Sequence, residues 1–317
     1  MAKFAQYFLR FTNDNLFAQE RWAERQQLLG KLLETDESME FLWHGKSKEG
    51  TADKPKRVYK HKVYHITDAP DIVVMRIANV KEMVIEKDFH SETIEHNPSC
   101  FVIFDNRNGC RRLAIQKLAT SFKSTDLVRK ILQKGLGDMM KEHYIGLEMS
   151  AQRYPKDFYS MWRAKEHHTA RLRFNIAART DFSSSERTSD HSLVGHIIAL
   201  EEACNASGYK SAIDVAARDK GGVLYVDESS EYIRSLVEYS ATTASPIELI
   251  TTDGASFDCY IDSDLESDDK IVTAEIATEH LESLFGNDED ARKLSETKVM
   301  EFVNSMKYVV DDKEIAS

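Results

Sequence analysis

The sequence lacks the motifs on which most assignments of enzymatic function rest. Its close glycine pairs, Gly135/Gly137 and Gly221/Gly222, match neither GxxxxGK[ST] nor GxGxxG, so no phosphate-binding loop is indicated. No Gly-x-Ser-x-Gly elbow is present, and no serine or cysteine can be tied to a general base. The sequence therefore favours a non-enzymatic protein with no catalytic residue and no cofactor.

Cysteine is scarce, and histidine offers no metal-binding pattern. The four cysteines (Cys100, Cys110, Cys204 and Cys259) show no CxxC spacing. Cys100 and Cys110 flank a predicted hairpin and could face each other across it, but reduced thiols are the expectation in a cytosolic chain. The adjacent pair His167-His168 points in different directions on a helix or strand. We therefore expect no metal site.

Long apolar runs are also missing. The longest, such as Ile72–Met75 and Phe101–Phe104, have the length of a strand and fall far short of a membrane span. The segment Met1–Arg10 lacks the basic cluster and apolar stretch of a secretory signal. We expect a cytoplasmic protein without direct membrane insertion.

Charge is abundant and is distributed unevenly along the chain. The net charge of all 317 residues is −11. Residues 1–180 hold 31 Lys/Arg against 23 Asp/Glu, whereas the remainder holds 11 against 30. The stretch Arg107–Arg173 holds 15 basic and 6 acidic residues. Such a division predicts a basic surface that meets a polyanion and an acidic module that guards, couples or oligomerises it.

The order of local patterns predicts an α+β protein of two domains, with mostly antiparallel sheets and flanking helices. We expect a basic α+β domain over residues 1–180, a polar serine-rich linker over residues 181–191, and an acidic regulatory or oligomerisation domain over residues 192–317. The expected strands are 57–66, 71–77, 82–86, 100–104, 111–117, 144–150, 170–177, 211–217, 223–226, 247–251 and 257–261. The expected helices are 124–140, 156–166, 193–206, 232–239, 275–285 and 291–306, and one more follows an aromatic segment within residues 4–34.

Two local signals in the first domain are specific. Asn108-Gly109 lies between two apolar runs and predicts a β-hairpin, because both residues tolerate positive φ. Ser124-Thr125-Asp126 provides side chains that can cap the N-terminus of the helix that follows.

A basic face on a predicted strand is the sharpest candidate site. Arg171, Arg173 and Asn175 alternate with Leu172, Phe174 and Ile176, so the two arginines share one face. Two arginines side by side repel each other unless an anion neutralises them, and guanidinium geometry suits phosphate. The candidate nucleic-acid-binding residues are Arg107, Arg111, Arg112, Lys117, Lys123, Lys130, Lys134, Arg163, Lys165, Arg171 and Arg173.

Other interpretations of these charges are open. The arginine strand would equally suit a solvent-facing strand paired with acidic residues from the second domain. The acidic residues around Glu86-Lys87-Asp88, with Asp71 upstream, would suit a metal-dependent nuclease, although the Glu-x-Lys spacing is absent. Asp253, Asp258, Asp262 and Asp264 form a denser group around a predicted hairpin edge.

The order of elements resembles that of the phage exclusion protein RexA and, more loosely, of the B component of the Kiwa antiphage system. The shared order is the strand at Ser99–Phe104, the strand at Leu113–Ile115, the helix from Ser124, the strands at Tyr144–Met149 and Arg171–Ile176, and the strand that contains Asp214. The resemblance covers roughly Ser99–Val226 and includes no diagnostic motif, so no functional residue transfers. It implies a bacterial defence component that binds DNA without strong sequence preference and acts as an oligomer beside a membrane partner.

The sequence thus predicts a DNA-binding component of an antiphage defence or phage-exclusion system, which forms a homo-oligomer and binds nucleic acid through its N-terminal domain. A protein–protein adaptor without nucleic-acid binding is the first alternative. A nuclease with an unrecognised metal site is the second.

Overall fold

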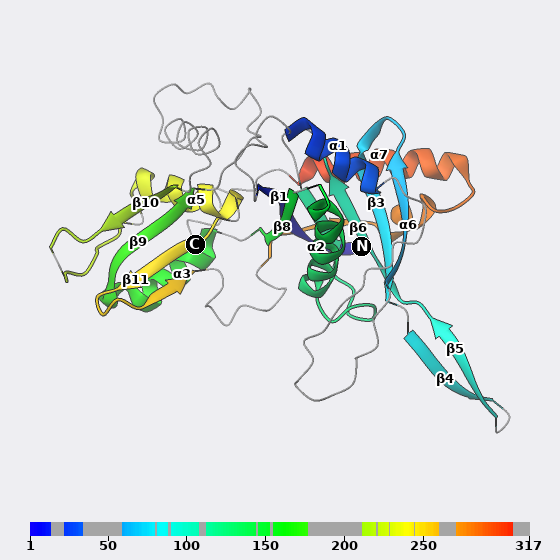
Figure 1. Cartoon of the computed structure of the whole chain (residues 1–317), viewed down its shortest axis with the longest axis horizontal. Helices are drawn as coiled ribbons and strands as arrows, with labels where there is room; N and C mark the ends of the chain where they lie inside the picture. The colour runs from blue at the N-terminus through cyan, green and yellow to red at the C-terminus, as the bar shows by residue number, and fades with distance from the viewer. Residues whose placement is uncertain are drawn as a thin grey trace. The chain divides into compact units, whose positions relative to one another are not determined.

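The computed structural model describes residues 1–13, 22–33, 59–79, 81–87, 90–107, 112–143, 145–152, 155–176, 211–219, 221–227, 229–243, 245–259 and 271–306. The chain forms two compact units (Figure 1). Unit 1 consists of Met1–Asn15, Ala23–Met149 and Thr273–Met306. Unit 2 consists mainly of Ser150–Val272, together with Leu16–Trp22 and Lys307–Ser317.

Unit 1 is built on a seven-stranded sheet whose described pairings are antiparallel, and which is curled like half of a barrel. The strand order is β13-β1-β7-β6-β3-β2, and β8 also pairs with β1. The bounds are β1 Ala2–Asn13, β2 Tyr59–Ile66, β3 Ala69–Asn79, β6 Ser99–Asp105, β7 Arg112–Gln116, β8 Ile145–Ala151 and β13 Thr273–Ile276. The central strands β6 and β7 are buried along almost their whole length, which explains why both are apolar.

Helices cover both faces of this sheet. On one face lie α1 (Trp22–Leu33) and α2 (Thr125–Lys141): the Tyr7 hydroxyl of β1 is 2.7 Å from Thr125 Oγ1. On the other face lie α6 (Thr278–Ser283) and α7 (Glu289–Ser305), which share a core cluster with β1, β3 and β6. In that cluster the rings of Phe4 and Phe302 meet edge to face at 5.4 Å.

A polar contact fixes α7 against the turn between β2 and β3. Glu296 Oε1 accepts hydrogen bonds from the Tyr64 hydroxyl at 2.7 Å and from the Thr67 hydroxyl at 2.7 Å. Burial alone would raise the pKa of Glu296, but these hydrogen bonds outweigh burial and lower it. The pKa of Tyr64 is raised, first by burial and then by the Glu296 carboxylate. The carboxylate of α7 is thus held in its charged form over the β2–β3 turn.

A two-stranded ribbon extends from the end of the sheet at which β3 finishes and β6 begins (Figure 1). Its strands are β4 (Lys81–Lys87) and β5 (His90–His96), which pair in antiparallel register from Lys81↔His96 to Lys87↔His90. The amide of Asn79 donates to the carbonyl of Pro98 at 2.9 Å, so the chain closes at the base of the ribbon. The strands β4 and β5 pair with each other and form a separate sheet.

Unit 2 contains a four-stranded antiparallel sheet of order β10-β9-β11-β12. The strands are β9 Thr169–Ile176, β10 Ser211–Ala216, β11 Ile247–Thr251 and β12 Ser256–Asp258. One face packs on α3 (Pro155–Lys165) and α5 (Glu231–Thr243), and a short 3-10 turn, η2 (Glu166–His168), precedes β9. Leu172 and Phe174 point into this core, so Arg171 and Arg173 lie on the opposite face, as their alternation predicts.

The α+β fold class is confirmed, with antiparallel sheets and flanking helices. The hairpin of β6 and β7 forms with Asp105 opposite Arg112, and Ser124 caps α2 by accepting a hydrogen bond from the Leu127 amide at 3.2 Å. The helix expected over residues 275–285 is wrong in its first part, because residues 273–276 form β13 and pair with β1. The expected helix 193–206 and the linker 181–191 lie outside the described residues.

The division into units differs from the expected boundary near residue 180. Strand β9 pairs with both β10 and β11, so it belongs to the same sheet as strands from the acidic half. The C-terminal segment Thr273–Met306 instead belongs to unit 1. The main segment of unit 2, Ser150–Val272, is therefore an insertion between β8 and β13. The two ends of this segment are adjacent, because the Val272 amide donates to the Gln152 carbonyl at 3.0 Å.

The charges divide differently between the two units than between the two halves of the sequence. The residues of unit 1 include 26 Lys/Arg and 28 Asp/Glu, and those of unit 2 include 16 and 25. The return of the acidic segment Thr273–Met306 to unit 1 removes the basic excess that residues 1–180 show along the chain. Unit 1 is nearly neutral, so any basic surface on it has to arise locally. None of the described helices is both long and apolar enough to cross a bilayer.

Candidate nucleic-acid interface

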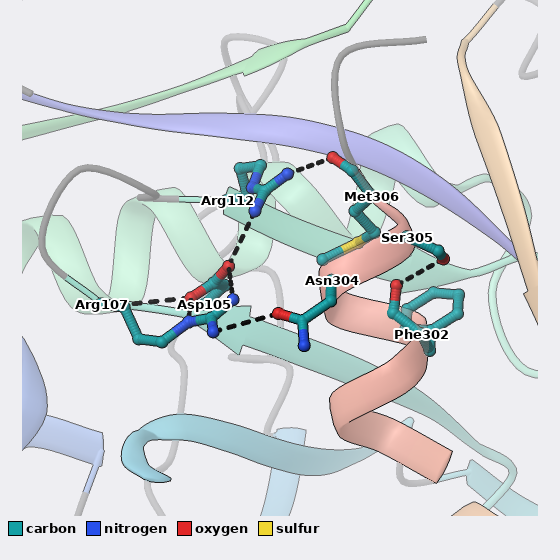
Figure 2. A network of polar contacts seen from close by, with 7 residues as sticks. All are labelled: Asp105, Arg107, Arg112, Phe302, Asn304, Ser305 and Met306. Atoms are coloured by element: carbon teal, nitrogen blue, oxygen red, sulfur yellow. Dashed lines mark hydrogen bonds and ion pairs between the residues drawn. The ribbon is translucent and has the colours of Figure 1, made fainter. Parts of the chain in front are cut away.

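Two of the predicted basic residues, Arg107 and Arg112, form a network of ion pairs around the buried side chain of Asp105 (Figure 2). The Asp105 side chain is fully buried at the end of β6. Arg107 binds both of its oxygens, with Nε at 2.8 Å from Oδ1 and Nη2 at 3.1 Å from Oδ2. Arg112 Nη2 donates to Oδ2 at 3.1 Å. Two guanidinium groups thus compensate one buried carboxylate.

The same arginines fasten the end of α7. Arg112 Nη1 donates to the carbonyl of Met306, the C-cap residue that follows Ser305 at the end of α7, and Arg107 Nη1 donates to Asn304 Oδ1 at 3.1 Å. A cation at this position satisfies an unpaired helix carbonyl and complements the negative end of the helix dipole. Arg107 and Arg112 therefore have a structural role: they connect the hairpin β6–β7 to the end of α7.

The predicted lysines of α2 carry carboxylate partners on the same helix. Lys130 Nζ lies 2.6 Å from Asp126 Oδ2, and Lys134 Nζ lies 2.7 Å from Asp138 Oδ2. Burial opposes ionisation of Asp126, but Lys130 and Arg129 together lower its pKa. These pairs have the spacing of one helical turn that is typical of a solvated helix surface.

The arginine pair of β9 shares one carboxylate from β10. Arg173 Nε lies 2.9 Å from Asp214 Oδ1, and Arg171 Nη1 lies 3.5 Å from Oδ2. Hydrogen bonding from Arg173 lowers the pKa of Asp214, and the charge of Arg171 adds to the effect. On the other side of β9, Asn175 Nδ2 donates to Glu248 Oε1 at 3.1 Å. The partner Asp214 comes from the acidic half of the sequence, as the solvent-facing alternative predicts.

The other candidates are dispersed over the two units. Lys165 Nζ lies 4.6 Å from the centre of the Phe257 ring in unit 2, and Arg163 is exposed on α3. Lys117 follows β7 and Lys123 precedes α2 in unit 1, whereas Arg111 lies outside the described residues. The structure thus separates the eleven residues into six contributed by unit 1, four contributed by unit 2, and Arg111.

A different set of cations meets at one end of the unit 1 sheet. Lys62 of β2 lies directly opposite Arg76 of β3, and both are exposed. Lys60, two residues earlier on β2, is exposed on the same face. Like charges placed opposite each other destabilise a strand pair. In the part of the chain that the structure describes, no carboxylate forms an ion pair with Lys62 or Arg76.

The loop between β7 and α2 adds Lys123 to this end of the sheet. Asn79 Nδ2 at the end of β3 donates to the Ser121 carbonyl at 3.1 Å, and the Ser121 hydroxyl donates to the Ser99 carbonyl at 2.8 Å. These bonds hold the loop beside the ends of β3 and β6, and Lys123 follows two residues later with an exposed side chain. We call Lys60, Lys62, Arg76 and Lys123 the basic end.

Neighbouring groups orient the Arg76 guanidinium. Its Nε donates to Ser99 Oγ at 2.8 Å, and its Cζ lies 5.6 Å from the centre of the Phe101 ring. The two terminal nitrogens have no partner among the described residues, and they are the atoms that bind a phosphate bidentately. Pre-organisation by Ser99 and Phe101 reduces the entropy that Arg76 would lose on binding an anion.

Sequence analysis identified Lys123 and missed the other three cations. Lys60 and Lys62 lie in the strand expected over residues 57–66, and Arg76 lies in the strand expected over residues 71–77, but no basic face was assigned to either strand. A usable signal was present: Lys60 and Lys62 alternate with Tyr59, His61 and Val63, which predicts one basic face. Their position opposite Arg76 depends on the β2–β3 register, which local patterns do not specify.

No group of three or more His, Cys, Asp or Glu side chains that could hold a metal ion occurs within the described ranges. No protein-family model matches the chain, and neither a curated protein nor a solved structure was found to be similar to it.

Proposed function

We propose that the protein is a non-enzymatic, cytoplasmic DNA-binding protein that contacts the phosphate backbone through the basic end, with little sequence preference. The observation that carries this proposal is the like-charged pair Lys62 and Arg76 on adjacent strands, exposed and without a carboxylate partner in the described part of the chain. A row of phosphates would neutralise the pair and relieve its repulsion.

The proposed role is that of a component of an antiphage defence or phage-exclusion system. The order β6, β7, α2, β8, β9 and β10, on which the resemblance to RexA and the Kiwa B component is based, supports this part of the proposal. The resemblance spans parts of both units, with three of these strands in unit 1. A homo-oligomer and a membrane-protein partner belong to the same proposal.

The test is binding of a fluorescent DNA duplex over a series of salt concentrations. If Lys62, Arg76 and Lys123 each neutralise one phosphate, the logarithm of the binding constant falls with the logarithm of salt at a slope of about −2.7. The double variant Lys62→Glu, Arg76→Glu should lower the affinity and reduce that slope by about two. It keeps like charges opposite each other, so the strand pair is not additionally strained, and a thermal melt checks the fold.

The matched control is Lys134→Glu with Lys141→Glu on α2, which makes the same change in net charge. Both lysines already bind Asp138, and we expect the salt slope to remain. Loss of binding in this control, with retention in the Lys62/Arg76 variant, would place the interface on α2 and refute the basic end. Absence of wild-type binding at about 50 mM salt would refute the function.

A protein–protein adaptor is the second candidate, and the ion pairs of β9 favour it. Arg171 and Arg173 are exposed but share Asp214, so this face of the unit 2 sheet alternates in charge. Alternating charges suit a protein partner better than a polyanion. Failure of DNA binding in every variant, with retention of an oligomeric or partner-bound state, would support the adaptor.

A further inference from the structure

Strand β10 lies at one edge of the described unit 2 sheet, where β9 is its single neighbour (Figure 1). The Ala217 amide donates to the Ala170 carbonyl at 2.9 Å. In an antiparallel pair, residues that bond to the neighbouring strand alternate with residues whose backbone groups point away from it. The amides and carbonyls of Ala212, Asp214 and Ala216 therefore point toward the outer edge, where no described residue bonds to them.

The devices that usually prevent an edge strand from pairing are missing from β10. Such strands are commonly short, bulged, or interrupted by lysine or proline. The six residues of β10 include neither lysine nor proline, and their register with β9 contains no shift. The opposite edge strand, β12, has three residues. Asp214 is the one charged residue of β10, and its carboxylate is shared by Arg173 and Arg171. The edge of β10 is therefore suited to pair with another strand.

The core of unit 2 is incompletely covered at this edge. Ile213 and Val215 pack against the core but are only half-buried, whereas their neighbours on β9, Phe174 and Leu172, are fully buried. A further strand beside β10 would place side chains against Ile213 and Val215 and remove apolar surface from water.

We propose that β10 pairs with β10 of a second copy in antiparallel register, so that the two unit 2 sheets join. The edge is complementary to itself, because a two-fold axis sets the outward amides of one copy opposite the outward carbonyls of the other. This pairing supplies an interface for the homo-oligomer of the proposed function, and it rests on that part of the proposal alone.

Charge selects the register of this pairing. An axis at Asp214 would set the two Asp214 carboxylates opposite each other, which is destabilising. An axis at Val215 sets Asp214 opposite Ala216 of the second copy, and Ala216 lies opposite Arg171 in its own sheet. Arg171 already leans toward β10, since its Nη1 is 3.5 Å from Asp214 Oδ2.

The small side chain of Ala216 leaves Arg171 a path to Asp214 of the second copy. The two backbones are two strand spacings apart, roughly 10 Å, which an arginine and an aspartate side chain span together. An axis at Ile213 would instead set Asp214 opposite Ala212, whose neighbour on β9 is the uncharged Asn175. The Val215 register is therefore the one that adds ion pairs between the copies.

Disulfide crosslinking of the full chain tests the register. The two Val215 residues would form a non-hydrogen-bonded pair with Cα atoms about 4.5 Å apart, close enough for a disulfide. We expect Val215→Cys to give a crosslinked dimer on a non-reducing gel after mild oxidation. Ile213→Cys is the matched control on the same face of β10; its two copies would be roughly 14 Å apart, so it should stay uncrosslinked. Wild type gives the background from the four native cysteines.

Sedimentation velocity and hydrogen exchange over a concentration series test the interface. Pairing of one edge strand buries little surface, so we expect a weak dimer whose formation protects the amides of residues 212–216. Ala216→Pro removes an outward amide without removing a bond to β9. It should raise the dissociation constant of the dimer about tenfold or more, because the symmetric dimer loses that hydrogen bond twice.

Arg171→Glu provides a second variant if Ala216→Pro fails a thermal melt. It sets two acidic groups against each other between the copies and should also weaken the dimer. Arg234→Glu on exposed α5 makes the same change in net charge and should leave association intact. A dimer that tolerates both Ala216→Pro and Arg171→Glu would use another surface and would overturn the inference.

A wild-type monomer at all concentrations would also overturn it, as would edge amides that are protected equally at every concentration, because the chain's own residues would then cover β10. Crosslinking of Ile213→Cys in place of Val215→Cys would refute the register. DNA binding is tested separately, because Lys62 and Arg76 belong to unit 1. A dimer that ignores DNA would refute DNA binding alone, whereas a monomer that binds DNA would refute β10 pairing and leave DNA binding standing.

Discussion

Removal of the acidic half by truncation and removal of unit 2 by excision should have opposite effects on folding. Truncation after Thr180 follows the boundary that the sequence indicates. It deletes β13, α6 and α7 from unit 1, and it deletes β10 and β11, the two neighbours of β9. Excision of residues 152–272, with a short Gly-Ser linker between Ala151 and Thr273, follows the topology instead.

The magnitude of the truncation effect follows from the core of unit 1. Seven apolar side chains from the deleted segment are 5% exposed or less in that core: Ile276, Leu281, Leu284, Val299, Phe302, Val303 and Met306. Burial of each contributes about 1.5–3 kcal/mol, which amounts to roughly 10–20 kcal/mol. The whole free energy of unfolding of a domain is about 5–15 kcal/mol. The truncated chain should therefore fail to fold.

Excision should be tolerated because the two ends of the inserted segment Ser150–Val272 lie next to each other. The hydrogen bond between the Val272 amide and the Gln152 carbonyl brings the two ends within reach of a linker of a few residues. The assay is circular dichroism with urea denaturation of both proteins. A cooperative transition in the truncated chain, or an unfolded excised chain, would refute the assignment of Thr273–Met306 to the core of unit 1.

Three further predictions concern single side chains of the two units. Asp105→Asn leaves two guanidinium groups uncompensated and should lower the free energy of unfolding by about 3–5 kcal/mol in urea denaturation, whereas Asp138→Asn on exposed α2 should change it by less than about 0.5 kcal/mol; equal effects would contradict a buried network. Because the pKa of Glu296 is lowered in the folded state, the stability that its charge provides should be complete above its ordinary value of 4.5 and disappear as the pH falls through the lowered pKa. The difference in unfolding free energy between wild type and Glu296→Gln should accordingly vanish in acid. A difference that grows in acid would mean that folding raises the pKa of Glu296 rather than lowering it. Burial raises the pKa of Cys100 to about 12, so peptide-resolved mass spectrometry should find this thiol unlabelled by iodoacetamide at about pH 8 until urea unfolds the chain; labelling in the native state would contradict its burial.

Local patterns in the sequence were sufficient for elements whose stabilising residues are neighbours along the chain. Helix α2 follows from the cap at Ser124 and the apolar stripe of Val128, Ile131 and Leu132, all of which are buried. The alternation in β9 likewise assigned Arg171 and Leu172 to opposite faces. In these cases the signal and the contact that explains it lie within one element.

The organisation of the units depends on contacts between distant segments. Glu275 and Ile276 were expected to begin a helix, but β1 supplies a strand partner more than 260 residues earlier in the chain, and this pairing overrides local preference. The same return of the chain makes the main segment of unit 2, Ser150–Val272, an insertion. The boundaries of the inserted segment lie near residues 150 and 272, and no shift in composition marks them. The segment near residue 180 has the composition of a linker but is not a boundary between the units.

The candidate site illustrates the same dependence on long-range pairing. A count over residues 107–173 shows nine excess positive charges, but four of its arginines are neutralised by carboxylates outside that window. Asp105 lies two residues before the window, and Asp214 lies 41 residues after Arg173. Conversely, the repulsion between Lys62 and Arg76 arises from strand register and is invisible to a count along the chain. A count of charge along a sequence therefore does not show which charges are paired in the fold.

The excised protein also tests whether the acidic residues of unit 2 restrain DNA binding. Residues 152–272 contain 13 Lys/Arg and 21 Asp/Glu, so excision changes the net charge from −11 to −3 and retains the whole basic end. If unit 2 opposes DNA through long-range repulsion, affinity for a duplex should rise at low salt, and the gain should shrink as the Debye length falls from about 30 Å at 0.01 M to about 8 Å at 0.15 M. A folded excised protein that binds DNA as the full chain does at every salt concentration would show that unit 2 exerts no electrostatic control. A gain that persists at high salt would instead show that the effect of unit 2 on DNA binding is not electrostatic.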